Sequence, residues 1–397
     1  MMSHNIGSRD DDDDDVGADP SPVPSSLHLQ HPADQSELAT PWSLQSLAVH
    51  ADDSPLRIPS HVPEQFLLPE HLRPTVKHDD YLIYNAHEEI PVIDMAACNL
   101  DGDVVDVTAM ETVVAQVRDA CLNWGFFEII NHGVEEELLS RVLRQATRFF
   151  TLPYLDKMKV VKPPGKYSGY GHATVKEGDV RPWSEGFYFT DETTTAEFAQ
   201  TLWPEDNNDF VDSYSQYTEK MKHLSGRLMQ IIVAGLGVNV AHFEQYTANT
   251  GGLLRWNYYP ACPEPLKTFG LTAHTDFNLL TVVHLGEVGG LQIEKDGKWI
   301  AVRPHPGALA VNIGDTLQVL TNARYKSVPH RAVVNTTKSR ISLVYFWVPL
   351  TSINIVPSPD LVTEDNPCKY KPFNFDAMTK MKQMYFLNTL DHFLLEE

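Results

Sequence analysis

The most constraining feature of this sequence is a pattern that begins near residue 250. Short runs rich in β-branched, aromatic and leucine residues follow one another there, and Gly, Pro or polar residues separate them. Runs of this kind predict strands, and several in close succession predict a barrel or a sandwich. We expect strands at Leu253–Tyr259, Leu279–His284, Leu291–Glu294, Leu309–Ile313, Val328–Val334 and Ile341–Trp347.

The preceding residues predict helices that buttress a sheet. A first strand is expected at Ile90–Ile93, followed by a helix from Thr108 that Gly125 ends, and by the strand Phe126–Ile130. Apolar residues then recur at helical spacing over Glu135–Phe150. This part of the chain therefore mixes helices with strands.

Two further helices are expected. Between Asp209 and Gly235 apolar residues recur at steps of three and four, which is typical of one long amphipathic helix. Near the C-terminus, the apolar positions from Phe375 to Tyr385 suit a helix that packs on the outside. The predicted fold class is mainly β with helical support (α+β).

These patterns divide the chain into segments. The leader is rich in Asp, Pro, Ser and His and includes the acidic run Asp10–Asp15, a composition typical of disorder. We expect an acidic disordered leader over 1–40, an extended arm over 41–89, an N-terminal domain over 90–200, a bracing helix region over 201–249, the β-rich core over 250–352 and a C-terminal helical segment over 353–397.

The charge of the chain limits its partners. The 397 residues include 31 Lys and Arg against 53 Asp and Glu, for a formal net charge of -22. Such a charge repels phosphate backbones and anionic lipids, so we expect neither nucleic acid nor membrane as a partner. Four cysteines without C-x-x-C spacing, no signal segment and no long apolar run make the cytoplasm the expected location. The oligomeric state stays open.

Three side chains in the β-rich region have the types and spacing of a metal site. His274 and Asp276 are two residues apart, so on a strand both would face the same side. His330 lies in another expected strand and is a plausible third ligand. Two imidazoles and one carboxylate leave coordination positions open, as oxygen chemistry at mononuclear iron requires. Zinc accepts the same ligands and is the alternative metal.

A second group of polar residues accompanies the metal motif. Arg340 and Ser342 are also two residues apart and can hold a carboxylate, the guanidinium in a bidentate manner. Asn257 and Tyr259 offer an amide and a phenol for the same small dicarboxylate. A hydrolytic zinc site has no use for such a clamp, so the combination favours iron.

With these motifs the chain resembles the plant 2-oxoglutarate and iron(II) dependent dioxygenases that share the isopenicillin N synthase fold. The resemblance runs from about Ile90 to the C-terminus. It rests on Ile90-Pro91-Val92-Ile93-Asp94, Trp124 to Val134, Asn257-Tyr258-Tyr259-Pro260, His274-Thr275-Asp276, His330 and Arg340-Ile341-Ser342.

The resemblance implies a fold and a set of cofactors. The expected core is a distorted double-stranded β-helix, or jelly-roll, flanked by N-terminal and C-terminal helices. Iron(II) would be held by His274, Asp276 and His330, and 2-oxoglutarate by Arg340, Ser342, Asn257 and Tyr259. Dioxygen would be the oxidant, ascorbate an activator, and succinate and carbon dioxide the by-products of hydroxylation.

Within this family the chain is most similar to gibberellin 3-oxidases, through stretches that include Trp183 to Phe187 and Gly169-Tyr170-Gly171. This similarity implies 3-beta-hydroxylation of a gibberellin, an apolar carboxylic acid. Trp183, Phe187 and Arg181 are the candidate substrate residues, with Lys166 considered for its nearness to the same motif.

Other functions stay open on the sequence alone. The same chemistry can act on another diterpenoid acid such as ent-kaurenoic acid, at other positions of a gibberellin as in 20- or 2-oxidation, or on a flavonoid. A hormone-binding protein that retains the fold without catalysis is the alternative outside enzymes.

Overall fold

The structure is a computed structural model that describes residues 60–74, 88–98, 107–171, 180–248, 250–350, 352–385 and 387–396. The expected leader over 1–40 and most of the expected arm over 41–89 lie outside the described residues. Within the described part of the chain, no helix combines the length and apolar character needed to cross a bilayer.

Two large sheets form the centre of the molecule. Eight strands form one sheet in the order β1-β2-β10-β7-β12-β5-β4-β3, and four form the other in the order β6-β11-β8-β9. The strands are β1 Val92–Asp94, β2 Phe126–Ile130, β3 Gly169–Gly171, β4 Glu185–Phe189, β5 Gly251–Tyr259, β6 Leu271–His274, β7 Leu280–His284, β8 Leu291–Lys295, β9 Lys298–Ala301, β10 Leu309–Ile313, β11 His330–Ala332 and β12 Arg340–Val348, with a separate pair β13 Asn354–Ile355 and β14 Phe373–Asn374.

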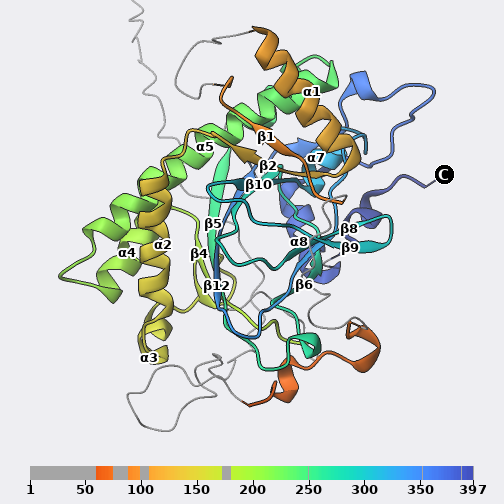
Figure 1. Ribbon diagram of the computed structural model, residues 1–397. Coiled ribbons are helices and arrows are strands. Elements are labelled where there is room, and N and C mark those ends of the chain that lie inside the picture. Colours follow the sequence, from red (N-terminus) through yellow and green to blue (C-terminus); the bar gives the residue numbers. More distant parts are fainter. Residues whose placement is uncertain are drawn as a thin grey trace, which may run out of the picture.

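Helices cover the large sheet on its outer side. Figure 1 shows α2, α4 and α5 on one side of this sheet, with β6, β8 and β9 on the other. The helices are α1 Val107–Asn123, α2 Glu136–Phe150, α3 Tyr154–Lys157, α4 Glu192–Leu202, α5 Asn208–Leu236, α6 Ala241–Thr247, α7 Asp315–Leu320 and α8 Phe375–Tyr385. The arrangement confirms the predicted jelly-roll core with helical support, and its sheets do not close into a barrel.

Alternation along the strands separates the core from the site. On β5, Leu254 and Trp256 point outward into the main core, where the Trp256 ring packs 5.5 Å from Phe210 of α5. Their neighbours Arg255 and Asn257 point inward to the space between the sheets. Successive strand residues face opposite sides, so one strand supports both the helix-packed core and the polar interior.

The long helix α5 is held on the sheet by its apolar face. Tyr217, Met221, Leu224 and Leu228 are fully buried along this face. The helix ends at Gly237, which has a φ of 68° and donates its backbone N–H to the carbonyl of Ala234. Glycine adopts this left-handed conformation without the steric cost that a side chain would add.

Most predicted elements occur within two residues of their expected bounds. Phe126–Ile130 and Leu309–Ile313 match the observed strands, and the expected long helix corresponds to α5. The strand expected over Val328–Val334 is shorter, and only His330–Ala332 pairs with neighbours. The large sheet also joins segments that the sequence divided, since β1 to β4 from 90–200 and β5 from 250–352 belong to it.

Candidate active site

The two histidines of the predicted metal motif lie directly opposite each other. His274 is the last residue of β6 and His330 the first residue of β11, and the antiparallel pairing of these strands matches them in register. Their ring centres are 4.3 Å apart. Asp276 lies beyond the end of β6, so the prediction that one strand carries His274 and Asp276 is wrong in this detail.

The turn after β6 nevertheless brings Asp276 to the histidines. Its Oδ1 is 3.7 Å from Nε2 of His274, and its Oδ2 is 3.7 Å from Nε2 of His330. The three possible ligand atoms all lie within 4.8 Å of one another. Two imidazole nitrogens and one carboxylate oxygen so arranged fit a divalent metal with open coordination positions.

Both imidazoles present the same nitrogen to this point. Nδ1 of His274 lies 2.9 Å from the carbonyl oxygen of Thr272, and Nδ1 of His330 lies 3.1 Å from that of Val328. A carbonyl only accepts, so each Nδ1 carries the proton and each Nε2 is the unprotonated nitrogen, the form that can bind a metal. Burial, followed by the nearby His330, lowers the pKa of His274 to about 3, which keeps its ring neutral.

The carboxylate of Asp276 is supported by the large sheet. Thr281 of β7 and Asn312 of β10 donate hydrogen bonds of 2.6 and 2.8 Å to Oδ2. Burial alone would raise the pKa of Asp276, but the two imidazoles and these hydrogen bonds outweigh it and hold that pKa below its usual value. The side chain is therefore a fixed anion.

The predicted 2-oxoglutarate residues form two cross-strand pairs. In the register of β12 with β5, Arg340 is opposite Tyr259 and Ser342 is opposite Asn257. The guanidinium carbon of Arg340 lies 4.3 Å from the Tyr259 ring centre, and Asn257 donates a hydrogen bond of 3.2 Å to the Ser342 hydroxyl. The structure thus brings together all four residues.

These four residues line an inner cavity that reaches the histidines and Asp276. Its volume is about 520 Å³, and Asn312 also lines it. The side-chain oxygen of Asn257 is buried and has no hydrogen-bond partner among the described residues, which leaves one acceptor unused. A water molecule that donates one hydrogen bond to this oxygen and another to a carboxylate would satisfy both acceptors.

A larger cavity opens on the other side of the same site. Its volume is about 930 Å³, counted out to solvent at its mouth. His274 and Asp276 line both cavities. The apolar lining of the larger cavity includes Leu253, Leu271, Phe277 and Phe346.

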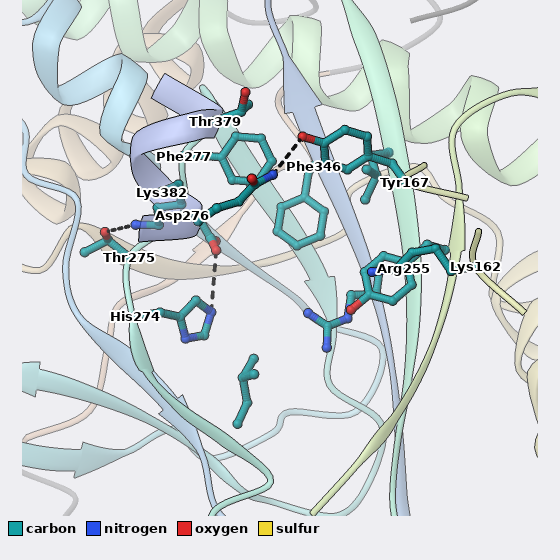
Figure 2. Close-up of a pocket in the computed structure, with 14 residues that line it drawn as sticks. Lys162, Tyr167, Arg255, His274, Thr275, Asp276, Phe277, Phe346, Thr379 and Lys382 are labelled. Carbon is teal, nitrogen blue, oxygen red and sulfur yellow. Dashed lines mark hydrogen bonds and ion pairs between the residues drawn. The ribbon is translucent and has the colours of Figure 1, made fainter. Parts of the chain in front are cut away.

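Sequence reasoning missed Arg255, which lines both cavities. The residue is 9% exposed, and among the described residues its Nε has no hydrogen-bond partner and its guanidinium forms no ion pair. Figure 2 shows its guanidinium pointing into the cavity, across from His274. The available signal was its position two residues before Asn257, on the same face of β5.

The structure does not bring Trp183, Phe187 and Arg181 to either cavity. Trp183 packs at 5.3 Å against Phe66 and donates its indole N–H to Pro260. Phe187 is fully buried and stacks at 4.0 Å on Phe149 in the main core. Their substrate role stays a prediction that neither cavity supports.

Comparisons with known families agree with this geometry. The profile of the 2OG-Fe(II) oxygenase superfamily matches residues 250–349, which include the histidines, Asp276 and Arg340. The N-terminal profile described as non-haem dioxygenase in morphine synthesis matches residues 90–206.

Characterised relatives cover most of the chain. Jasmonate-induced oxygenase 2 of Arabidopsis thaliana is 36% identical over 321 residues, 80% of this chain and 84% of the relative. Gibberellin 20 oxidase 1-A of Triticum aestivum is 34% identical over 342 residues, 84% of this chain and 91% of the relative. Gibberellin 3-beta-dioxygenase 4 of Arabidopsis thaliana is 35% identical over 314 residues, 77% of this chain and 84% of the relative.

A solved structure extends the agreement to three dimensions. The crystal structure of JOX2 in complex with 2OG, Fe and JA matches with a TM-score of 0.74 and 32% identity, over 89% of this chain and 97% of that chain. The chain therefore belongs to the 2OG-Fe(II) oxygenase superfamily, and it is a dioxygenase that uses iron(II), 2-oxoglutarate and dioxygen.

Proposed function

We propose that this dioxygenase hydroxylates a gibberellin, with release of succinate and carbon dioxide. The favoured reaction is 3-beta-hydroxylation, and the alternatives are gibberellin 20- or 2-oxidation and oxidation of a related diterpenoid acid. The observation that carries the choice of an apolar carboxylic acid is Arg255. This buried cation faces an apolar cavity beside the proposed metal ligands.

The proposed metal ligands are His274, Asp276 and His330. Their hydrogen bonds support this role, because each side chain uses one polar atom to bind the protein and offers another to the ion. The arrangement leaves the faces toward both cavities open. His274 and Asp276 line both cavities, so a metal ion held by these residues would be reachable from each cavity.

Arg340 and Ser342 are proposed to bind the far carboxylate of 2-oxoglutarate. Asn257 and Tyr259, paired with them across the sheet, fix the orientation of that clamp. The guanidinium fork matches a carboxylate in a bidentate manner, whereas the hydroxyl adds one further donor.

Iron(II) with 2-oxoglutarate and dioxygen supplies the oxidising chemistry, and the chain's own residues decide which bond is presented to it. Phe277 and Phe346 give the cavity an apolar wall beside Asp276, and Arg255 offers one anchoring charge. A rigid substrate held at both its apolar body and its carboxylate has few orientations. Positioning of this kind accounts for a large part of the barrier reduction in such enzymes.

The comparisons do not choose between an acid and a flavonoid, because Flavanone 3-dioxygenase 2 of Oryza sativa subsp. japonica is 35% identical over 80% of this chain. A relative with a jasmonate name and two with gibberellin names have nearly equal identities, from 34% to 36%. A jasmonate is therefore the second candidate substrate. A flavonoid fits less well, because it lacks a carboxylate to balance Arg255.

The test combines purified protein, iron(II), 2-oxoglutarate, ascorbate and oxygen with a panel of gibberellins, ent-kaurenoic acid, jasmonate and a flavanone. Product mass and succinate are measured together. A product heavier by one oxygen from a gibberellin, formed in step with succinate, supports the proposal, and the product's structure then gives the hydroxylated carbon. Coupled turnover of jasmonate or a flavanone but of no gibberellin would overturn it.

A further inference from the structure

A second cation lies beside Arg255 in the larger cavity. The ammonium of Lys162 is 4.9 Å from the ring centre of Tyr188, and the guanidinium carbon of Arg255 is 4.8 Å from the same point. The two cations are therefore no further apart than the sum of these distances. Figure 2 shows Lys162 and Arg255 on the opposite side of the cavity from His274 and Asp276.

The remaining charges of this cavity are already balanced. Lys382, the third cation that lines it, forms an ion pair of 3.0 Å with the buried Asp315. Asp276 is the anion proposed to bind the metal. Iron(II) and Arg340 together balance Asp276 and the two carboxylates of 2-oxoglutarate, so Lys162 and Arg255 remain without a counter-charge among the described residues.

Two neighbouring cations in a cavity are unfavourable without a ligand. Each loses solvation, and each repels the other. The consequence is visible at Lys162, because burial, followed by the charge of Arg255, lowers the pKa of this amine to about 8. Contact with the Tyr188 ring offsets only part of such a cost.

We propose that Lys162 and Arg255 each bind a separate acidic group of the substrate, so that the enzyme selects a dicarboxylic acid over a monocarboxylic acid of the same shape. This inference rests on the proposed function and narrows its substrate class. The fork of Arg255 can satisfy one carboxylate by itself in a bidentate manner. A second carboxylate then balances Lys162, which a monoacid would leave unpaired.

The proposal divides the candidate acids. A gibberellin with a free second carboxyl group offers both charges on one rigid, apolar body. A jasmonate offers only one. The apolar residues Leu253, Phe277 and Phe346 would contact the body between the charged ends.

The test measures binding rather than turnover. Full-length protein with iron(II) and 2-oxoglutarate, kept free of oxygen, is titrated by calorimetry with a gibberellin dicarboxylic acid and with its two monomethyl esters. Wild-type protein is expected to bind each ester more weakly than the diacid by about tenfold or more, the scale of one charged hydrogen bond. Lys162→Met is expected to weaken binding of the diacid by a similar factor.

The esters identify the group that Lys162 binds. Lys162→Met should leave the affinity for one ester unchanged, because that ester lacks the carboxylate that Lys162 would contact. Lys159→Met is the matched control, since Lys159 lies on the same segment, is 57% exposed and pairs with Asp156. This control should bind all three ligands as wild type does.

Two results would overturn the inference. The first is that wild-type protein binds the diacid no more tightly than it binds the two monomethyl esters. The other is a Lys162→Met variant that weakens binding of the diacid and both esters by the same factor, which indicates a structural role or one shared carboxylate. Either result leaves the proposed function intact if a gibberellin is still hydroxylated with coupled succinate release.

Discussion

At the scale of single residues, the site depends on side chains that each have two polar atoms. The protein binds one atom of each side chain, and the other faces the proposed metal position. His274 and His330 each bind a backbone carbonyl through Nδ1 and present Nε2. Asp276 accepts two hydrogen bonds at Oδ2 and directs Oδ1 toward His274. Because one atom of each side chain is fixed by the protein, the other is held in place before any ligand arrives.

The first residue-scale prediction concerns Arg340. Arg340→Lys should raise the KM for 2-oxoglutarate by about tenfold or more, because a point ammonium loses the bidentate geometry and its accompanying bond energy. Steady-state kinetics with varied 2-oxoglutarate measures this effect. Arg303→Lys, on a side chain that is 47% exposed and pairs with Glu89, should leave the KM unchanged. An unaltered KM in Arg340→Lys would exclude the clamp.

The second residue-scale prediction concerns pH. Lys162 has a pKa lowered to about 8, so its charge is present below that pH and lost above it. Affinity for an acidic substrate should therefore fall as pH rises through about 8. Lys162→Arg stays charged and should show a flat profile. Calorimetry between about pH 6.5 and 9.5 tests both proteins.

The other groups near Lys162 do not produce this profile. An arginine guanidinium such as that of Arg255 does not lose its proton in proteins. Burial raises the pKa of Tyr188, which stays neutral. Lys382, Asp276 and His274 line the same cavity and are present in both proteins. A pH dependence that persists in Lys162→Arg would assign the titration to another group.

At the scale of elements, the C-terminal helix α8 is joined to the loop that carries Asp276. Lys382 of α8 donates to the Thr275 hydroxyl at 2.6 Å and to the Asp315 carboxylate at 3.0 Å. Asp315 begins α7 and also accepts from Thr275. Its backbone N–H donates to the carbonyl of Asp276 at 2.6 Å. One buried ion pair therefore links a wall of the substrate cavity to a proposed metal ligand.

Close backbone approach makes this junction possible. A Cβ at Gly314 would lie 2.0 Å from the carbonyl oxygen of Asn278, so no other residue fits without movement of the chain. The N–H of Gly314 donates to Leu279 at 3.0 Å. The start of α7 thus packs directly on the turn that follows Asp276.

The element-scale prediction is that Lys382→Met destabilises the protein by on the order of 3 kcal/mol, because it leaves a buried carboxylate without its cation. Burial already raises the pKa of Asp315 above its usual value. The protonated form tolerates burial and is more populated in acid, so the stability deficit should be larger at pH 8 than at pH 5. Thermal unfolding at both pH values measures it.

A matched variant distinguishes the loss of the Lys382–Asp315 ion pair from any effect that a Lys→Met substitution has on the stability of the helix itself. Lys380→Met is on the same helix, where Lys380 is 51% exposed and pairs with Asp376. It should change stability by less than about 0.5 kcal/mol. Asp315→Asn combined with Lys382→Met should recover part of the lost stability. Equal effects of the two lysine variants would argue against a structural role for the ion pair.

At the scale of the whole molecule, the elements that could be predicted from the sequence are those whose residues repeat at a regular spacing. The long helix and most core strands follow from apolar spacing, and the four clamp residues follow from i, i+2 spacing on strands. The turn that carries Asp276 has no such period, so its departure from β6 was not foreseen. Arg255 was missed because one cation in a strand shows its importance only when the cavity and the lack of an acidic partner are visible.

The same reasoning explains the motif around Trp183. Its aromatic residues could line a pocket or fill a core, and the sequence does not distinguish these outcomes. The structure places Trp183 against Phe66 and Phe187 against Phe149, so the motif stabilises the large sheet next to β5. The resemblance to gibberellin 3-oxidases over Trp183 to Phe187 is therefore explained by packing beside the site.

The proposed metal site also joins the two sheets. His274 and His330 belong to the four-stranded sheet, whereas the donors that fix Asp276, Thr281 and Asn312, belong to the eight-stranded sheet. A metal held by all three ligands therefore crosslinks the halves of the core. Unfolding must break this link, so ligand binding should stabilise the whole molecule.

The whole-molecule prediction is that manganese(II), a divalent probe that is stable in air, raises the unfolding temperature, and that above its Kd the gain in stability grows with the logarithm of the free manganese concentration. At about 100 times its Kd the gain should approach about 2.7 kcal/mol, and excess chelator should remove it. Asp276→Ala should abolish the metal-dependent shift, whatever its effect on the metal-free protein. Asp376→Ala, at a partly exposed carboxylate of α8, should keep the full shift. A metal response that survives in Asp276→Ala would mean that the histidines alone bind the ion, and the two sheets would then not be crosslinked through it.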